Sequence, residues 1–134
     1  MKKIIVFFIL TLSLSFLIFA QGKGPREVYL EYVNADNFFT AKRLTAEKLL
    51  KQFEDMEAKH GKNVNMIYIM LRKVALPNKD VFTIENIEIQ GDSAVLHAKS
   101  TAFVGKPEEH EFTGTVYFKK ISNEWKIIKD VWKP

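Results

Sequence analysis

The sequence predicts an α+β domain in which N-terminal helices pack on the concave face of a curved four-stranded antiparallel sheet. Residues 81–132 alternate apolar and polar side chains in runs that are separated by turn residues, which is typical of an antiparallel meander. Residues 25–76 instead repeat apolar side chains at helical spacing. Helices followed by a meander indicate a sheet that is covered on one face.

The first predicted strand, Val81–Ile89, changes its alternation halfway. Phe82 and Ile84 share one phase, whereas Ile87 belongs to the other. One extra residue moves the following side chains to the opposite face of a strand. We therefore expect a β-bulge near Glu85–Asn86.

The other three predicted strands are Ser93–Val104, Glu111–Ile121 and Glu124–Trp132. Small side chains such as Ala94 line one face of the second strand, so a helix can pack closely against it. Gly114 in the middle of the third strand indicates sharp curvature or a close backbone approach. The last strand has large apolar groups on both faces, and strict alternation sets Trp125, Ile127 and Val131 against Ile128 and Trp132.

Three helices are predicted before residue 62. Pro25 suits the first turn of the first helix, and Asp36 is expected to end that helix and to cap the next. The second helix is predicted at Phe38–Leu44. Thr45 is the expected N-cap of the third helix, which should stop at Gly61.

Residues 63–76 fit two structures. Met66, Ile67, Met70, Leu71 and Val74 have helical spacing, but the β-branched and aromatic residues also suit a strand. The helix is favoured because Asn63 can cap it and Pro77 can end it.

The first twenty residues predict a signal peptide. Lys2 and Lys3 precede an uncharged run, Ile4–Ala20, that ends in a small residue. We expect cleavage after residue 20, which leaves a short leader at 21–24 and one domain at 25–134. The processed protein is expected to be exported to the periplasm or secreted and to have no stable membrane span. The alternative is that residues 4–20 stay attached as an uncleaved anchor helix. The chain has no cysteine, which excludes disulfides and lipid attachment through cysteine.

The charge of the processed chain is close to balanced. The whole chain has a net charge of +4, and without residues 1–20 it has 18 basic and 16 acidic residues, or +2. The basic residues are interleaved with acids and form no stripe with aromatics, so nucleic acid is not an expected partner.

Short motifs across the predicted domain resemble the nuclear transport factor 2-like superfamily, also called cystatin-like cones, and most of all its small exported members. The residues that carry this resemblance are Pro25–Tyr29, Tyr32, Ala35–Phe38, Leu44–Leu50, Ile89–Val95 and Asn123–Ile127. The resemblance implies a cone-shaped domain with a hollow interior. Enzymes of that superfamily, such as ketosteroid isomerases and dehydratases, place an Asp, His or Tyr in the cone, but no such motif matches here residue by residue.

Four residues could line a pocket in such a cone: Tyr29, Tyr32, Tyr68 and Met70. Three residues could form a contact with a second subunit: Phe103, Tyr117 and Trp132. His97 has no identifiable partner for acid–base catalysis, and Glu108–Glu111 cannot converge on a metal because adjacent strand residues point to opposite sides. No catalytic residue, metal site or cofactor is therefore expected.

These observations favour an exported, non-catalytic domain that binds a small apolar or amphipathic molecule, or forms a homodimer through its sheet. One alternative is an isomerase- or dehydratase-type enzyme that uses Asp36 or His97 with a tyrosine. The mark of such an enzyme would be an interior ionisable group with a shifted pKa. The other alternative is an envelope structural module without a ligand.

Overall fold

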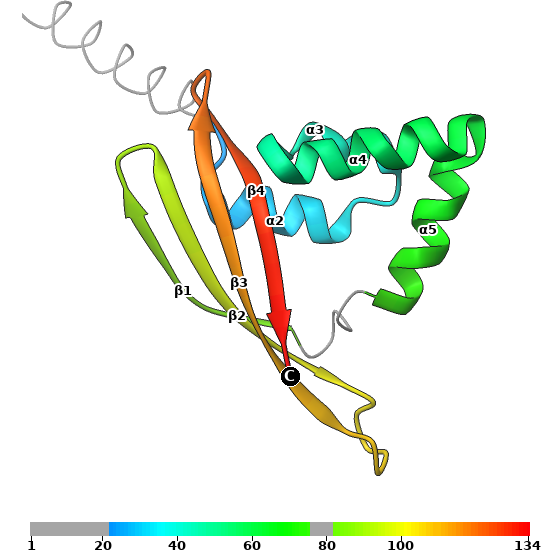
Figure 1. Ribbon diagram of the computed structural model, residues 1–134. Helices are drawn as coiled ribbons and strands as arrows, with labels where there is room; N and C mark the ends of the chain where they lie inside the picture. The colour runs from blue at the N-terminus through cyan, green and yellow to red at the C-terminus, as the bar shows by residue number, and fades with distance from the viewer. Residues whose placement is uncertain (1–21, 76–81) are drawn as a thin grey trace, which may run out of the picture.

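The structure, a computed structural model, describes residues 22–75 and 82–134 and has the α+β architecture that the sequence predicts (Figure 1). The predicted signal peptide and Pro77, the predicted end of the last helix, lie outside these residues. The helices are α2 (Pro25–Asn34), α3 (Phe38–Arg43), α4 (Glu47–His60), the 3₁₀ turn η1 (Gly61–Asn63) and α5 (Val64–Ala75), and the strands are β1 (Thr83–Gln90), β2 (Ser93–Ala102), β3 (His110–Ile121) and β4 (Glu124–Lys133).

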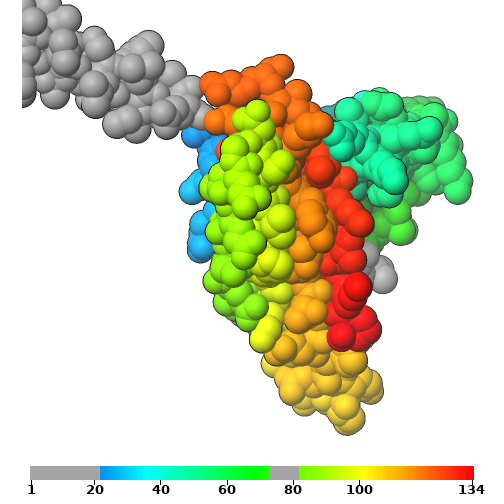
Figure 2. Space-filling model, turned by 60° about the vertical axis from the view of Figure 1, so that its left-hand side comes forward, coloured from blue at the N-terminus to red at the C-terminus, as the bar shows by residue number. Residues whose placement is uncertain are grey.

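The strands form one curved antiparallel meander in the order β1-β2-β3-β4. The inner face of β2 is small, as predicted, and its alternate residues from Ala94 to Ser100 are buried. The predicted bulge in β1 is confirmed, because the β1–β2 register shifts between Ile84 and Asn86. α2 lies along the inner face, whereas no described helix covers the outer face (Figure 2).

A second bulge, in β4, was not predicted. Phe118 of β3 pairs with Ile127, but the preceding Tyr117 pairs with Lys129, so Ile128 is the extra residue. The prediction that strict alternation continues through β4 is therefore wrong. Beyond the bulge, Asp130 joins Ile127 on the inner face.

The helix boundaries agree with the sequence, but two of the predicted caps are wrong. Pro25 occupies the first turn of α2 as expected. Asn37, not Asp36, caps α3: its side-chain oxygen accepts a hydrogen bond from the Thr40 N–H at 2.8 Å. Thr45 does not cap α4, because its hydroxyl donates to the carbonyl of Lys42 at 2.7 Å and so closes the end of α3.

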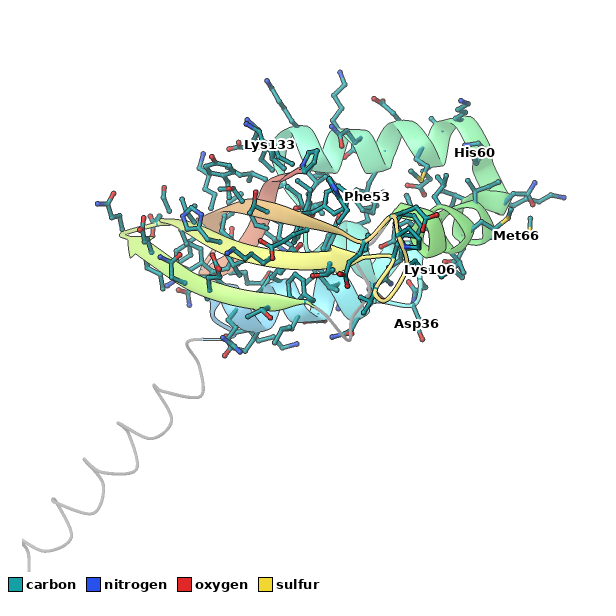
Figure 3. The ribbon with its side chains drawn as sticks, turned by 90° about the horizontal axis from the view of Figure 1, so that it is seen from below. Asp36, Phe53, His60, Met66, Lys106 and Lys133 are labelled. Atoms are coloured by element: carbon teal, nitrogen blue, oxygen red, sulfur yellow. The ribbon has the colours of Figure 1, made fainter. Side chains whose placement is uncertain are left out.

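Replacing Asn37 with Ala is expected to lower the free energy of unfolding by about 1 kcal/mol, because the Thr40 N–H loses its acceptor. Chemical denaturation measures the change. Asp36→Ala is the matched control, since Asp36 is exposed and points away from the body of the molecule (Figure 3). An equal loss in both variants would contradict the assignment of the cap.

Residues 64–75 are helical, which confirms the favoured prediction for this segment. Asn63 is the last residue of η1, which runs directly into α5. The Asn65 side chain ties α5 to α3 by accepting the Phe38 N–H at 2.8 Å. Among the described helices, none is both long and apolar enough to span a bilayer.

The apolar interior has two clusters. The first packs α2 against the sheet and includes Tyr29, Leu96 and Phe118. The second lies between α3, α4 and α5 and includes Phe38, Phe53, Val64 and Tyr68. Two partly buried side chains contact both clusters, namely Tyr32 and Leu49.

Candidate functional site

A group of polar atoms is buried where α2 crosses β4. The Tyr29 hydroxyl, the Asp130 Oδ1 and the Trp132 Nε1 are all inaccessible to solvent, and none makes a hydrogen bond of good geometry with another described residue. We call Tyr29, Asp130 and Trp132 the polar cluster. Buried polar groups are almost always paired, so three unpaired groups in one place mark a position that can receive a ligand or an ordered water.

Burial raises the pKa of Asp130 from its usual 3.8 to about 6. The nearby Trp132 N–H lowers the pKa of Asp130 and so offsets part of this rise. The geometry between the two groups does not meet the criteria for a hydrogen bond. No described Lys or Arg forms an ion pair with Asp130. The carboxyl group therefore titrates at a higher pH than an exposed Asp, at about pH 6.

Aromatic rings surround the polar cluster. The Tyr29 ring stacks on Tyr32 with centroids 6.0 Å apart and lies 5.8 Å from Phe82, which in turn lies 6.0 Å from Trp132. Burial, reinforced by the Asp130 charge, raises the pKa of Tyr29 and of Tyr32. Both hydroxyls therefore stay protonated and can donate a hydrogen bond at neutral pH.

An open groove of about 220 Å³ lies beside this region, between α2, α4 and α5. Its wall is mostly apolar, and Arg72 lies at its rim with the guanidinium carbon 5.8 Å from the centre of the Tyr68 ring. The residues that line this groove, called the α4–α5 groove below, are Tyr32, Leu49, Gln52, Phe53, Met56, Tyr68, Leu71 and Arg72.

Tyr32 connects the groove to the polar cluster. Its ring lines the groove, and the charges of both Asp130 and Arg72 affect the pKa of its hydroxyl. The first charge raises this pKa and the second lowers it. The hydroxyl is thus within electrostatic range of an interior carboxyl group and a cation at the rim.

A second hollow, of about 300 Å³, lies between the start of α2 and the β3–β4 turn. Its charged groups are already paired with one another. Glu31 accepts from Lys23 at 2.6 Å and from Arg43 at 3.2 Å, and the Lys126 ammonium donates to the carbonyl of Arg43 at 2.7 Å. This hollow offers fewer unsatisfied groups than the polar cluster.

The structure brings three of the four predicted pocket residues near one another. Tyr32 and Tyr68 line the α4–α5 groove, and Tyr29 lies deeper, in the polar cluster. Met70 is 59% exposed on α5 and does not line the groove.

The predicted interface residues lie in three different places. Phe103 is 61% exposed beyond the end of β2, and Tyr117 is on the outer sheet face, where Lys129 lies over its ring at 5.6 Å. Trp132 is on the inner face, packed over Gly114. These three residues therefore share no single surface, and homodimerisation stays a prediction.

Asp130 and Arg72 are functional candidates that the sequence reasoning missed. The signal for Asp130 was present: large apolar residues in both phases of β4 resemble the phase change that predicts the β1 bulge. His97 lies on the outer face of β2, opposite the buried alanines. Within residues 22–75 and 82–134, no three His, Asp or Glu side chains converge as metal ligands.

No family model and no curated protein matches this chain. A solved structure that it resembles is a SEC-C motif containing protein from Rhodopseudomonas palustris, with a TM-score of 0.46 and 11% sequence identity over 77% of this chain and 70% of that chain. The assignment to the nuclear transport factor 2-like superfamily is corrected accordingly. The protein found is described by a SEC-C motif, and none of the comparisons finds a nuclear transport factor 2-like protein.

Proposed function

We propose that the domain binds a small amphipathic molecule in the α4–α5 groove, with one polar end directed past Tyr32 toward the polar cluster. The observation that carries this proposal is the buried, unpaired polar cluster next to a groove with apolar walls. Binding sites for small molecules combine these two features.

The chemistry of the atoms narrows the ligand class. Trp132 Nε1 can only donate a hydrogen bond, an ionised Asp130 can only accept, and the Tyr29 hydroxyl can do both. A ligand hydroxyl satisfies both a donor and an acceptor at once. At the other end, Arg72 favours an anionic group at the rim. The groove volume is below the common range for drug-sized ligands, so the ligand is expected to be small or only partly enclosed.

The fluorescent anion anilinonaphthalene sulfonate tests the groove, because it has an apolar ring system and one negative charge. Gln52 is exposed at the rim, so Gln52→Trp should fill the opening without disturbing the interior. We expect binding of the dye to weaken by about tenfold, which corresponds to ~1.4 kcal/mol of lost contact. Fluorescence titration gives the affinity.

Lys51→Trp is the matched control, since Lys51 is the exposed neighbour of Gln52 on α4 and does not line the groove. This variant should bind the dye as the unaltered chain does. Equal binding by all three proteins would show that the dye does not use the groove. Native mass spectrometry of the purified protein then shows whether a natural ligand is retained.

A second candidate is proton-transfer catalysis with Asp130 as the general base and a tyrosine hydroxyl as the hydrogen-bond donor. The observation that favours it is the Asp130 pKa of about 6, close to the pH at which a base works best. A retained ligand would be incubated in D₂O with the protein and with Asp130→Asn. Deuterium incorporation that requires Asp130 would support catalysis, and no incorporation would leave binding as the function.

We also propose that this function is carried out after export, to the periplasm or the exterior. The support is the charge and hydropathy pattern of residues 1–20, which lie outside the described part of the chain. Mass spectrometry of the protein from the cell envelope fraction tests cleavage after Ala20.

A further inference from the structure

Asp130 is a buried acceptor that has no counter-charge among the described residues. Its pKa is shifted by its burial and by the Trp132 N–H, and no described Lys or Arg contributes to the shift. None of the ion pairs within residues 22–75 and 82–134 includes this carboxyl group. Its Oδ1 atom is inaccessible to solvent and accepts no hydrogen bond of regular geometry. A carboxylate in such a place is stabilised most by a positively charged donor.

The neighbours of this carboxyl group are aromatic. Trp132 is two residues further along β4 and therefore on the same face of the strand. The charge of Asp130 affects Tyr29 and Tyr32, where it raises the pKa of both hydroxyls. Phe82 lies beside two of these rings, with its centroid 5.8 Å from that of Tyr29 and 6.0 Å from that of Trp132. Aromatic rings around an anionic group favour an organic cation.

The polar cluster distinguishes between two kinds of ligand end. A hydroxyl would make hydrogen bonds with these atoms but would leave the negative charge of Asp130 without a counter-charge. A protonated amine has three donors, so it can donate to the Asp130 carboxylate and to the oxygen of the Tyr29 hydroxyl. Its charge also neutralises the carboxylate, and a hydrogen bond between two charged groups is about twice as strong as one between neutral groups.

We infer that the polar end of the ligand is a protonated amine, which binds between the Asp130 carboxylate and the surrounding aromatic rings. This inference rests on the function proposed above, in which the apolar part of the ligand occupies the α4–α5 groove, and it adds the charge of the buried end. The ligand class is therefore an apolar amine. An anionic group at the far end would match Arg72 at the rim, so a zwitterion with an apolar middle fits both ends of the site.

A fluorescent probe is already present inside the polar cluster. The chain has two tryptophans, so Trp125→Phe, a conservative change in the core, leaves Trp132 as the source of emission. Hexylammonium and hexanol have the same apolar chain and differ in the charge of the polar end. Each would be titrated into this protein at pH 8, where the Asp130 carboxyl group is ionised. We expect the Trp132 emission to reach half saturation at an about tenfold lower concentration of hexylammonium than of hexanol.

Asp130→Asn in the same background should lower the affinity for hexylammonium about tenfold and leave the affinity for hexanol unchanged. Asp55→Asn is the matched control, because it removes the same charge from an exposed position on α4 that does not line the groove. This control should alter neither affinity. The comparison of the two compounds in the unsubstituted background does not depend on how either variant folds.

Equal affinities for the two compounds, unchanged by Asp130→Asn, would overturn the inference and leave binding in the groove as the function. No response of Trp132 to either compound would also overturn it. The dye titration with Gln52→Trp then shows separately whether the α4–α5 groove binds a ligand. An equal loss of hexylammonium affinity in Asp130→Asn and Asp55→Asn would assign the preference to the net charge of the protein, which contradicts the inference as well.

Discussion

Replacing Asp130 with Asn is expected to raise the free energy of unfolding by about 2–3 kcal/mol at pH 8, because it removes a buried charge that has no cationic partner among the described residues. Asn has nearly the same shape, and its side-chain oxygen keeps an acceptor near the Trp132 N–H. The gain corresponds to a pKa that is about two units higher in the folded protein than in the unfolded chain.

The sign of the pH dependence follows from this difference. Between pH 3.8 and about 6 the folded protein binds more protons at Asp130 than the unfolded chain does, so stability falls as the pH rises. Above about pH 6 the full cost is present, and below pH 3.8 it is absent. The stability of Asp130→Asn relative to the unaltered protein should therefore grow from pH 4 to pH 7 and then stay constant.

Urea denaturation at a series of pH values measures this difference. Asp55→Asn is the control, since Asp55 is exposed on α4 and its replacement should change stability little at any pH. A constant difference between Asp130→Asn and the unaltered protein from pH 4 to pH 8 would show that Asp130 is not buried as a charge. A true gain in stability would favour a functional reason for the carboxyl group, because stabilising substitutions commonly reduce function at such positions.

Replacing Gly114 with Ala is expected to destabilise the domain by about 2–3 kcal/mol. A Cβ at this position would be 2.6 Å from two atoms of the Trp132 ring. The ring has little freedom to move, because Phe82 packs against it on the inner face. Overpacking of this kind outweighs the gain of less than about 1 kcal/mol from replacing a strand glycine.

A double-mutant cycle isolates this contact. In a Trp132→Ala background, Gly114→Ala should cost little or even stabilise the protein, because the ring that the new methyl group meets is absent. Thermal unfolding of the four proteins gives the coupling energy. An equal cost of Gly114→Ala in both backgrounds would mean that the glycine is needed for backbone curvature and not for the approach of the ring.

The sequence predicted the helices and the meander because both depend on local periodicity. The β1 bulge was also predictable, since Ile84 and Ile87 stand in conflicting phases. In β4 the same phase conflict, between Ile127 and Ile128, was interpreted as a strand with apolar side chains on both faces. Asp130 was therefore not predicted to lie on the inner face of the sheet. Only the pairing with β3 distinguishes those two interpretations.

The groove could not be predicted from the sequence for another reason. Its lining residues come from α2, α4 and α5, and their convergence depends on how these helices pack and not on spacing along the chain.

The prediction that Thr45 caps α4 was wrong because it, too, depended on a tertiary contact. Thr45 has the chemistry of an N-cap, but β4 pairs with the segment Leu44–Ala46, and that pairing moves the start of α4 to Glu47.

The division of the interior into two clusters has a consequence for cooperativity. α3 and α5 join the sheet mainly through α2 and α4, and Tyr32 and Leu49 are side chains shared by both clusters. Such an arrangement allows the second cluster, between α3, α4 and α5, to open as a separate foldon at a lower free energy than global unfolding. A molecule in the α4–α5 groove would contact both shared side chains, so its binding would slow amide hydrogen exchange in α5 and merge the two units into one cooperative transition.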